Sequence, residues 1–330
     1  MESKPTDKIG LALGSGSARG WAHIGVIQAL ADAGVRIDYV AGSSIGAVAG
    51  AIFASGGVDR LFELVPQLDW KKFASFFDIV FPKSGLVDGR KVARFVRKYV
   101  TETDIEDLPI PFCAVATDLA TGKPVLIREG DIIDAVRASI SFPGVFTPVR
   151  RGGQVLVDGG LSEPIPVSVV RQMGADFVIA VDLNHDIVGK KRFGRAARRE
   201  SQRKPTLRRV TARLRERSRF FQRLDQRLAD MTKRFPKRSR SREKLPNIFD
   251  VLIASLNIME SQISAARLES DPPDLLVQPE LGHVRFLEFH RAREAIEAGY
   301  VAAKEQLMKL EEGDFQQGSA SGPPRLKRRG

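Results

Sequence analysis

Hydrophobic and polar residues follow two different patterns along the N-terminal part of the chain. Short, uninterrupted apolar runs are typical of buried strands, whereas apolar residues spaced by three and four predict helices with one buried face. The runs predict strands at Ile9–Leu13, Val35–Ala41, Ile110–Thr117, Val125–Arg128, Val155–Val157 and Phe177–Leu183. The periodic stretches predict helices at Trp21–Ala33, Asp131–Ser139 and Pro166–Met173, and a helix of small residues that ends at Ala54. This alternation favours an α/β fold, a three-layer sandwich in which helices cover both faces of a mostly parallel central sheet.

A basic segment from Lys190 to Lys244 interrupts this alternation. Within it, apolar residues recur at spacings of three and four from Leu207 to Phe235, which predicts an amphipathic helix about 43 Å long. The predicted organisation is a core at 8–184, a basic helical insertion at 190–244, helices at 247–312 that complete the domain, and a disordered tail at 313–330.

The C-terminal part is predicted to contain two helices and a short strand. Pro246, Asn247 and Asp250 indicate a helix start. The apolar positions that follow predict a buried stripe made of Ile248, Val251, Leu252, Leu256, Met259 and Ile263. Leu275–Val277 is expected to return to the sheet, and a last helix is expected from Glu288 to Glu311.

Charge changes this picture because it is concentrated in the insertion. The chain has 52 lysines and arginines against 40 acidic residues, a formal net charge of +12. Residues 190–244 hold 23 of the basic residues and five of the acidic ones, a local charge of +18, so the remaining 275 residues sum to −6. Only the insertion is therefore expected to attract a polyanion.

Three interpretations of the insertion stay open. An Arg-rich helix with an apolar stripe can lie in an anionic membrane interface, or its stripe can pack on the helix that begins near Asn247. A nucleic-acid partner is disfavoured, because it rests on charge alone without interleaved aromatic residues or a zinc or winged-helix pattern. Peripheral contact with an anionic membrane is the interaction that we expect.

The sequence lacks features that are typical of several classes of protein. No apolar run reaches the roughly 18 residues of a membrane-spanning helix, and Met1–Lys8 lacks the apolar core of a signal peptide. Cys113 is the only cysteine, so no intramolecular disulfide can form. No cluster of histidine, cysteine and acidic residues has metal-ligand spacing. We expect a cytoplasmic protein without a metal or other cofactor, able to bind peripherally to the inner face of the membrane.

Two glycine-rich turns lie between a predicted strand and a predicted helix. In Gly42-Ser-Ser-Ile-Gly46, small residues two places before and after Ser44 permit the sharp turn that exposes a nucleophilic hydroxyl, although a structural turn uses the same residues. In Gly14-Ser-Gly-Ser-Ala-Arg-Gly20, backbone N–H groups can face an anion. The P-loop pattern fails there, and the dinucleotide fingerprint fails because its last glycine falls on Arg19 or Trp21. An oxyanion hole fits this turn better than a nucleotide cradle.

A third turn, Asp158-Gly159-Gly160, places a carboxylate at the end of a predicted strand. Taken alone, it reads as an aspartate in a glycine turn. Three strand-end loops of this kind in one parallel sheet are expected to converge on the carboxyl edge of the sheet, where such folds place their sites.

These turns occur in the order found in bacterial patatin-like phospholipases, which the sequence resembles. The resemblance includes Trp21-Ala-His-Ile-Gly-Val26 and Ala138-Ser-Ile-Ser-Phe-Pro-Gly-Val-Phe146, and it covers residues 8–184 well and 247–309 more loosely. It implies a serine lipid acyl hydrolase with a Ser–Asp dyad, acting on phospholipid, lysophospholipid or a similar acyl ester.

The resemblance also implies a role for each motif residue. Ser44, between Gly42 and Gly46, would be the nucleophile that forms an acyl-enzyme, and Asp158 would be the general base. The glycine pair of the third motif is Gly159 and Gly160.

The glycine loop would hold the oxyanion through N–H groups around Gly16 and Ser17. The loop motif also contains Gly14, Arg19 and Gly20. Many members of the family have glycine where this chain has Ser15 and Ser17. A serine adopts a positive φ angle reluctantly, so these two positions decide the geometry of the hole.

Two alternatives stay open. A Ser-His-Asp triad requires one of the late histidines, none of which lies in a recognisable strand-end loop: His185, His283 and His290. His23 is expected to be a packing or capping residue. In the second alternative, the protein is a catalytically silent scaffold that acts through its basic insertion. An aromatic cluster either lines an acyl pocket or belongs to the core: Trp70, Phe73, Phe76, Phe77 and Phe81.

Overall fold

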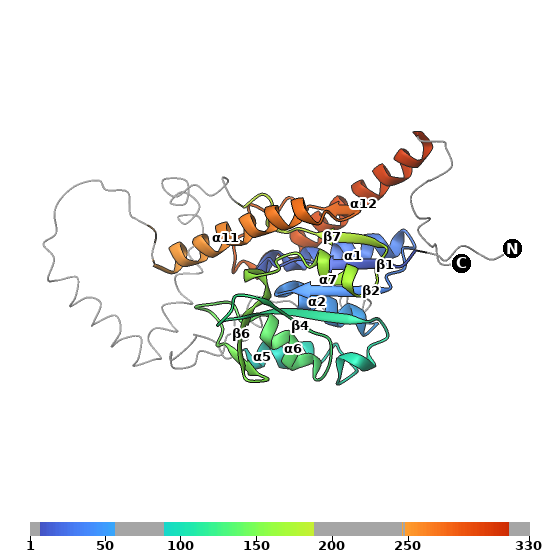
Figure 1. Ribbon diagram of the computed structural model, residues 1–330. Helices are drawn as coiled ribbons and strands as arrows, with labels where there is room; N and C mark the ends of the chain where they lie inside the picture. The colour runs from blue at the N-terminus through green and yellow to red at the C-terminus, as the bar shows by residue number, and fades with distance from the viewer. Residues whose placement is uncertain (1–6, 57–88, 188–245, 247, 317–330) are drawn as a thin grey trace, which may run out of the picture. The chain divides into compact units, whose positions relative to one another are not determined.

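An eight-stranded mixed sheet forms the centre of the described part of the chain (Figure 1). The computed structural model describes residues 7–56, 89–187, 246 and 248–316. The strands are β1 (Ile9–Leu13), β2 (Tyr39–Ser43), β3 (Phe112–Asp118), β4 (Pro124–Ile127), β5 (Val149–Arg151), β6 (Gln154–Asp158), β7 (Phe177–Val181) and β8 (Leu275–Val277). Their order is β5-β6-β3-β2-β1-β7-β8, with β4 also paired to β3. The predicted insertion at 190–244 and the aromatic cluster between Trp70 and Phe81 lie outside the described residues.

The central strands are parallel and the strands beyond β3 are antiparallel. β1 pairs in parallel with β2 and β7, β2 with β3, and β7 with β8. β3 pairs antiparallel with β4 and with β6, and β6 with β5. The prediction of a mostly parallel sheet is confirmed.

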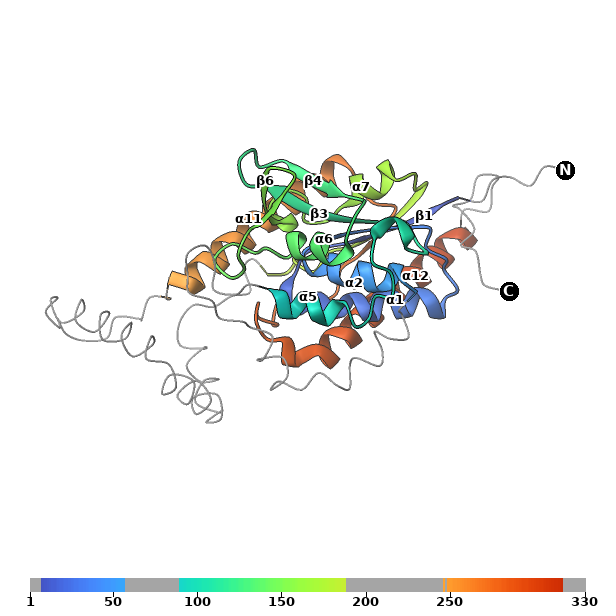
Figure 2. The same ribbon diagram turned by 90° about the horizontal axis from the view of Figure 1, so that it is seen from below.

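Helices cover both faces of the sheet, as the uninterrupted apolar strands predicted (Figure 2). The helices are α1 (Ala22–Asp32), α2 (Ile45–Ala54), α5 (Arg90–Val96), α6 (Ile132–Ser139), α7 (Val167–Gln172), α11 (Ile248–Ser270) and α12 (Ala292–Gln316). Along β1, Leu11 and Leu13 pack into one core with α1, α2, α6 and α12, whereas Ala12 packs into another with α7. The three-layer sandwich is therefore confirmed.

The chain falls into two compact units. One comprises residues 1–190 and 253–330, and the other residues 191–252. All the described strands belong to the first unit. The last helix extends to Gln316, so residues 313–316 of the expected disordered tail are helical, and the rest of that tail lies outside the described residues. None of the described helices is both long and apolar enough to cross a membrane.

Three local predictions were wrong. The strand predicted from Val35 begins at Tyr39, because Gly34 ends α1 with φ 73° and the Val35 N–H caps the helix on the Leu30 carbonyl. β5 was missed, although Gly152 and Gly153, both with positive φ, turn it back into β6. The short helix α5 was missed as well.

The prediction of the buried face of α11 was wrong as well. Several residues of the predicted apolar stripe are exposed: Ile248, Val251, Leu252 and Met259. The helix instead buries the polar side chains of Asn257, Glu260 and Ser264. The apolar pattern does not identify the buried face of α11, because the surface that this helix covers is itself polar.

Helices α1 and α12 pack backbone against backbone. A Cβ atom added at Gly25 would overlap the Ile296 carbonyl oxygen, and one added at Gly299 would overlap the Ala22 carbonyl oxygen. Because the obstacle at each position is backbone, no side-chain rotation can make room. The two glycines therefore fix how closely these helices approach.

We expect Gly25→Ala to lower the free energy of unfolding by about 2–3 kcal/mol, since overpacking forces the helices apart. Urea denaturation monitored by circular dichroism measures this. Gln28→Ala, at a partly exposed position of the same helix, serves as the control and should change stability by less than about 0.5 kcal/mol. Equal effects of the two substitutions would contradict the close approach.

Candidate active site

Ser44 occupies a strained turn between β2 and α2. Its φ of 56° and ψ of −123° lie in a region that non-glycine residues rarely adopt, at a cost of about 1–3 kcal/mol. A Cβ atom at Gly42 would overlap the backbone of Gly46, and one at Gly46 would overlap the Leu13 carbonyl. Gly42 is thus required by the sharpness of the turn, as the sequence predicted, and Gly46 by the close approach of α2 to β1.

The Ser44 hydroxyl donates a hydrogen bond of 2.6 Å to Asp158 Oδ2. The other carboxyl oxygen, Oδ1, accepts the Gly160 N–H at 2.8 Å, and the Thr117 hydroxyl donates to the Asp158 carbonyl at 2.8 Å. Asp158 is fully buried. The structure therefore brings together the two residues to which the sequence assigned nucleophile and base.

The strand that carries Asp158 runs in a direction that the sequence did not predict. Its strand, β6, runs antiparallel to β3, so the three loops do not converge at the carboxyl ends of parallel strands. Instead, Asp158 pairs with Ala116 of β3, while Ser43 of β2 pairs with the adjacent Val115. This register places the end of β6 level with the end of β2.

Burial raises the pKa of Asp158 to about 7, although the hydrogen bonds from Ser44 and Gly160 favour the ionised form. A carboxylate with a pKa near neutrality is a much stronger base than an exposed aspartate, while it still ionises at the pH of the cell. The arrangement can thus accept a proton from a serine hydroxyl.

The glycine loop follows β1 and presents unpaired N–H groups. The Gly14 and Ser15 N–H groups bind the Val181 and Pro164 carbonyls. Within the described part of the chain, the N–H groups of Gly16 and Ser17 have no protein partner. Two adjacent free donors of this kind can bind an oxyanion.

Ser17 adopts the positive φ that the sequence identified as a difficulty. Its φ is 50°, whereas Ser15 has no positive φ. The Ser17 hydroxyl donates to the Phe286 carbonyl at 2.7 Å, and the Ala18 N–H binds the same oxygen at 3.2 Å. These contacts offset the strain that a serine experiences in this conformation.

Arg19 is directed into the protein. Its side chain is 1% exposed, and its terminal nitrogens donate to Asn184 Oδ1 at 2.9 Å and to the Val284 carbonyl at 3.4 Å. Burial lowers the pKa of Arg19 to about 10, so the guanidinium stays charged at neutral pH. Arg19 thus anchors the loop. Gly20 is required because a Cβ there would overlap Ile45.

Several residues near the site were not predicted. The Ser44 N–H donates to Ser139 Oγ at 2.9 Å, and that hydroxyl donates to the Val115 carbonyl. Ser139 lies within a motif that the sequence identified, but nothing in the pattern indicated this role. Glu260, in the middle of α11, gave no signal because its neighbours form an apolar pattern.

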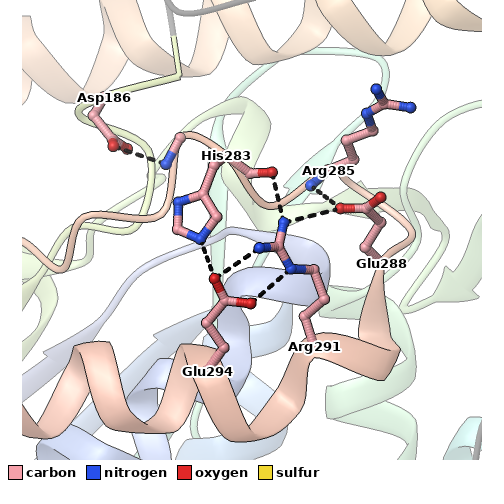
Figure 3. A network of polar contacts seen from close by, with 7 residues as sticks. Asp186, His283, Arg285, Glu288, Arg291 and Glu294 are labelled. Atoms are coloured by element: carbon pink, nitrogen blue, oxygen red, sulfur yellow. Dashed lines mark hydrogen bonds and ion pairs between the residues drawn. The ribbon is translucent and has the colours of Figure 1, made fainter. Parts of the chain in front are cut away.

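The histidines do not contact the pair in the described part of the chain. His23 is buried, with Nε2 2.8 Å from the Gly14 carbonyl, and burial lowers its pKa to about 4. It is therefore neutral and packs beneath the glycine loop. His283 is paired with Glu294 on the surface (Figure 3). Among the described residues, no group of histidine, cysteine and acidic side chains is arranged to hold a metal ion.

An apolar cavity of about 110 Å³ opens from Ser44. Its wall includes Ile45, Val48 and Ile52 from α2 and Phe95 from α5. Further aromatic residues also line it: Trp21, Phe142, Phe146, Phe286 and Phe289. Such a lining suits a hydrocarbon chain.

A polar network holds the segment that carries Phe286 (Figure 3). Arg291 binds Glu294 and Glu288, and its Nη1 donates to the His283 carbonyl at 2.9 Å. The Gly282 N–H donates to Asp186 at 2.7 Å. The network keeps the 282–288 segment in place, so that Phe286 lies against Phe142 at the cavity, with ring centroids 4.6 Å apart.

The sequence is similar to known proteins along most of its length. Residues 11–171 match the family described as patatin-like phospholipase. An NTE family protein of Mycobacterium tuberculosis is 34% identical over 356 residues, which cover 97% of this chain and 97% of that protein. The lysophospholipase NTE1 of Mycosarcoma maydis is 38% identical over 183 residues, 53% of this chain and 10% of that protein. Among solved structures, VipD from Legionella pneumophila covers 92% of this chain and 67% of its own, with a TM-score of 0.45 and 14% identity.

The raised pKa of Asp158 predicts how stability changes with pH. The folded state binds this proton more tightly than the unfolded state, so the contribution is present below about pH 4 and is lost as pH rises through about 7. Asp158→Asn cannot ionise. We expect it to be more stable than the wild type at pH 8, on the order of 1–3 kcal/mol, and the gain to shrink towards pH 4.

Urea denaturation at several pH values measures this difference, with Asp118→Asn as the control. Hydrogen bonds from the Ala120 N–H and the Thr121 hydroxyl lower the pKa of Asp118, so its substitution should act with the opposite sign. A stability difference for Asp158→Asn that does not vary with pH would contradict the raised pKa.

Proposed function

The chain belongs to the NTE family of patatin-like phospholipases, and we propose that it hydrolyses acyl esters of phospholipids or lysophospholipids through an acyl-enzyme on Ser44. The observation that carries this proposal is the 2.6 Å hydrogen bond from the Ser44 hydroxyl to a buried Asp158 at the mouth of an apolar cavity. The similarity to a protein named lysophospholipase supports the same class of substrate.

The proposed reaction begins as Ser44 Oγ attacks the ester carbonyl carbon while Asp158 Oδ2 takes the hydroxyl proton. The carbonyl oxygen becomes an oxyanion, which the N–H groups of Gly16 and Ser17 bind. When the bond to the leaving alcohol breaks, Asp158 gives its proton to that alcohol. Water then attacks the acyl-enzyme with Asp158 again as base, which restores Ser44 and releases the fatty acid.

The cavity supports a lipid substrate over a small polar ester. The side chains next to Ser44 are aliphatic or aromatic along one side of α2, from Ile45 to Ile52, a distance of about 10 Å at the rise of an α-helix. An acyl chain bound there would leave the polar headgroup outside the cavity. Burial of each methylene contributes about 0.8 kcal/mol, which favours long chains.

The basic segment at 190–244 is proposed to bring the enzyme to an anionic lipid surface. Its charge of +18 contrasts with the −6 of the remaining chain, and each basic residue near such a surface contributes about 1 kcal/mol. The alternative, a catalytically silent scaffold that acts through this segment, predicts lipid binding without turnover.

We expect a fluorophosphonate probe to label the wild-type protein and not Ser44→Ala, because the probe reacts only with an activated serine. Hydrolysis of a panel of phospholipids and lysophospholipids should fall about a thousandfold or more in Ser44→Ala and in Asp158→Asn. Circular dichroism verifies the fold of both variants. Turnover that persists in Asp158→Asn and disappears when His185, His283 or His290 is replaced would favour a triad, and a wild type without labelling or turnover would favour the scaffold.

Deletion of residues 192–242 is expected to weaken binding to vesicles of anionic phospholipid by at least about tenfold while hydrolysis of a short soluble ester continues. Vesicle co-sedimentation measures binding, and zwitterionic vesicles provide the control. The wild-type interaction should also weaken with salt, because exposed charges are screened. Equal binding of both proteins to anionic vesicles would remove the membrane role of the segment.

A further inference from the structure

A second carboxyl group lies directly behind the Ser44–Asp158 pair. Glu260, on α11, is 3% exposed. A Cβ atom added at Gly160 would lie 2.8 Å from Glu260 Oε1, and the Gly160 N–H is the donor to Asp158 Oδ1. One glycine therefore separates the two carboxyl groups.

The other oxygen of Glu260 contacts the two remaining loops of the site. Ser15 Oγ and Asn184 Nδ2 each lie 3.3 Å from Oε2, and they lie 3.2 Å from one another. Ser15 precedes the free N–H groups of the glycine loop, and Asn184 accepts the hydrogen bond from Arg19. Glu260 thus joins α11 to the loops that follow β1, β6 and β7.

Among the described residues, the two groups that donate to Glu260 are neutral, so no direct salt bridge offsets the cost of ionising this buried carboxyl. Both hydrogen bonds to Oε2 are longer than the roughly 2.7–2.9 Å of bonds to a charged acceptor. Arg19 donates its terminal nitrogens to Asn184 and Val284. On α11 itself, Arg267 pairs with Glu163 at 3.2 Å.

The charged groups around Glu260 reinforce this preference. Burial, followed by the charge of Asp158, raises the pKa of Glu260 to about 8, although Arg19 and Ser15 favour the ionised form. Asp182 and Asp186 add negative charge near Arg19. Asp158 has the shorter hydrogen bonds of the two carboxyl groups, which favours ionisation of Asp158 over ionisation of Glu260.

On the basis of the function proposed above, we propose that Glu260 is a positioning residue that acts in its protonated, uncharged form, joining three loops of the site without adding a second negative charge beside Asp158. A carboxylate at this position would oppose ionisation of the base and the formation of an oxyanion at Gly16 and Ser17. Loss of the Glu260 proton therefore limits the reaction at alkaline pH.

The test compares Glu260→Gln, which resembles the protonated acid, with Glu260→Ala. The measurement is kcat/KM for a short soluble ester from pH 5.5 to 10. We expect the wild type to lose activity below about pH 7 and again above about pH 8. Glu260→Ala should lose at least about tenfold at pH 7, and Glu260→Gln should recover that loss and lack the alkaline decline. Glu269→Gln, at an exposed position of the same helix, should lose activity at both ends of the pH range, as the wild type does.

Two results would overturn the proposal: a folded Glu260→Gln as inactive at pH 7 as Glu260→Ala, which would mean that the carboxylate is required, or a Glu260→Gln that keeps the alkaline limb. Absence of Ser44-dependent turnover in the wild type would instead defeat the proposed function. In that case urea denaturation still tests the protonated state, since a raised pKa makes the wild type lose stability relative to Glu260→Gln as pH rises through about 8. A stability difference without this pH dependence would also overturn it.

Discussion

The hydrogen bond between Ser44 and Asp158 requires two strands that run in opposite directions to end at the same level of one sheet. β2 delivers Ser44 where it leaves the sheet, and β6 runs in the opposite direction along the same side of β3, so that its last residue, Asp158, meets the end of β2. A slip of one residue in the β3–β6 register would turn Asp158 to the opposite face of the sheet. The contacts of Thr117 and Gly160 with Asp158 therefore hold a register as well as a side chain.

Burial away from water raises the basicity of the Asp158 carboxylate in this hydrogen bond. An aspartate in water is too weak a base for a serine, and burial raises its pKa at the expense of folding stability. The protein also places Arg19 and Glu260 in this interior. Stability has to come from elsewhere, and the two aliphatic cores on either side of the sheet, with the close contact of α1 and α12, supply it.

Sequence reasoning succeeded where the constraint is local. A Cβ atom at Gly42 would overlap the backbone of Gly46, so this constraint lies within the motif itself and the sequence reveals it. It failed where the constraint is distant. The direction of β6 depends on a partner strand, and the carbonyl that receives the Ser17 hydroxyl belongs to Phe286. The buried face of α11 was wrong because amphipathic patterns assume an apolar partner, whereas Glu260 meets Ser15 and Asn184.

The contact between Asn184 and Glu260 joins the two sides of the long connection that separates β7 from α11. Because both anchor points belong to the same buried cluster, the free-energy cost of closing this connection depends only weakly on its length, at about 0.6 kcal/mol for each doubling. A change of length between these two anchor points is therefore expected to cost the folded state little, because it leaves the buried contact of Asn184 and Glu260 in place.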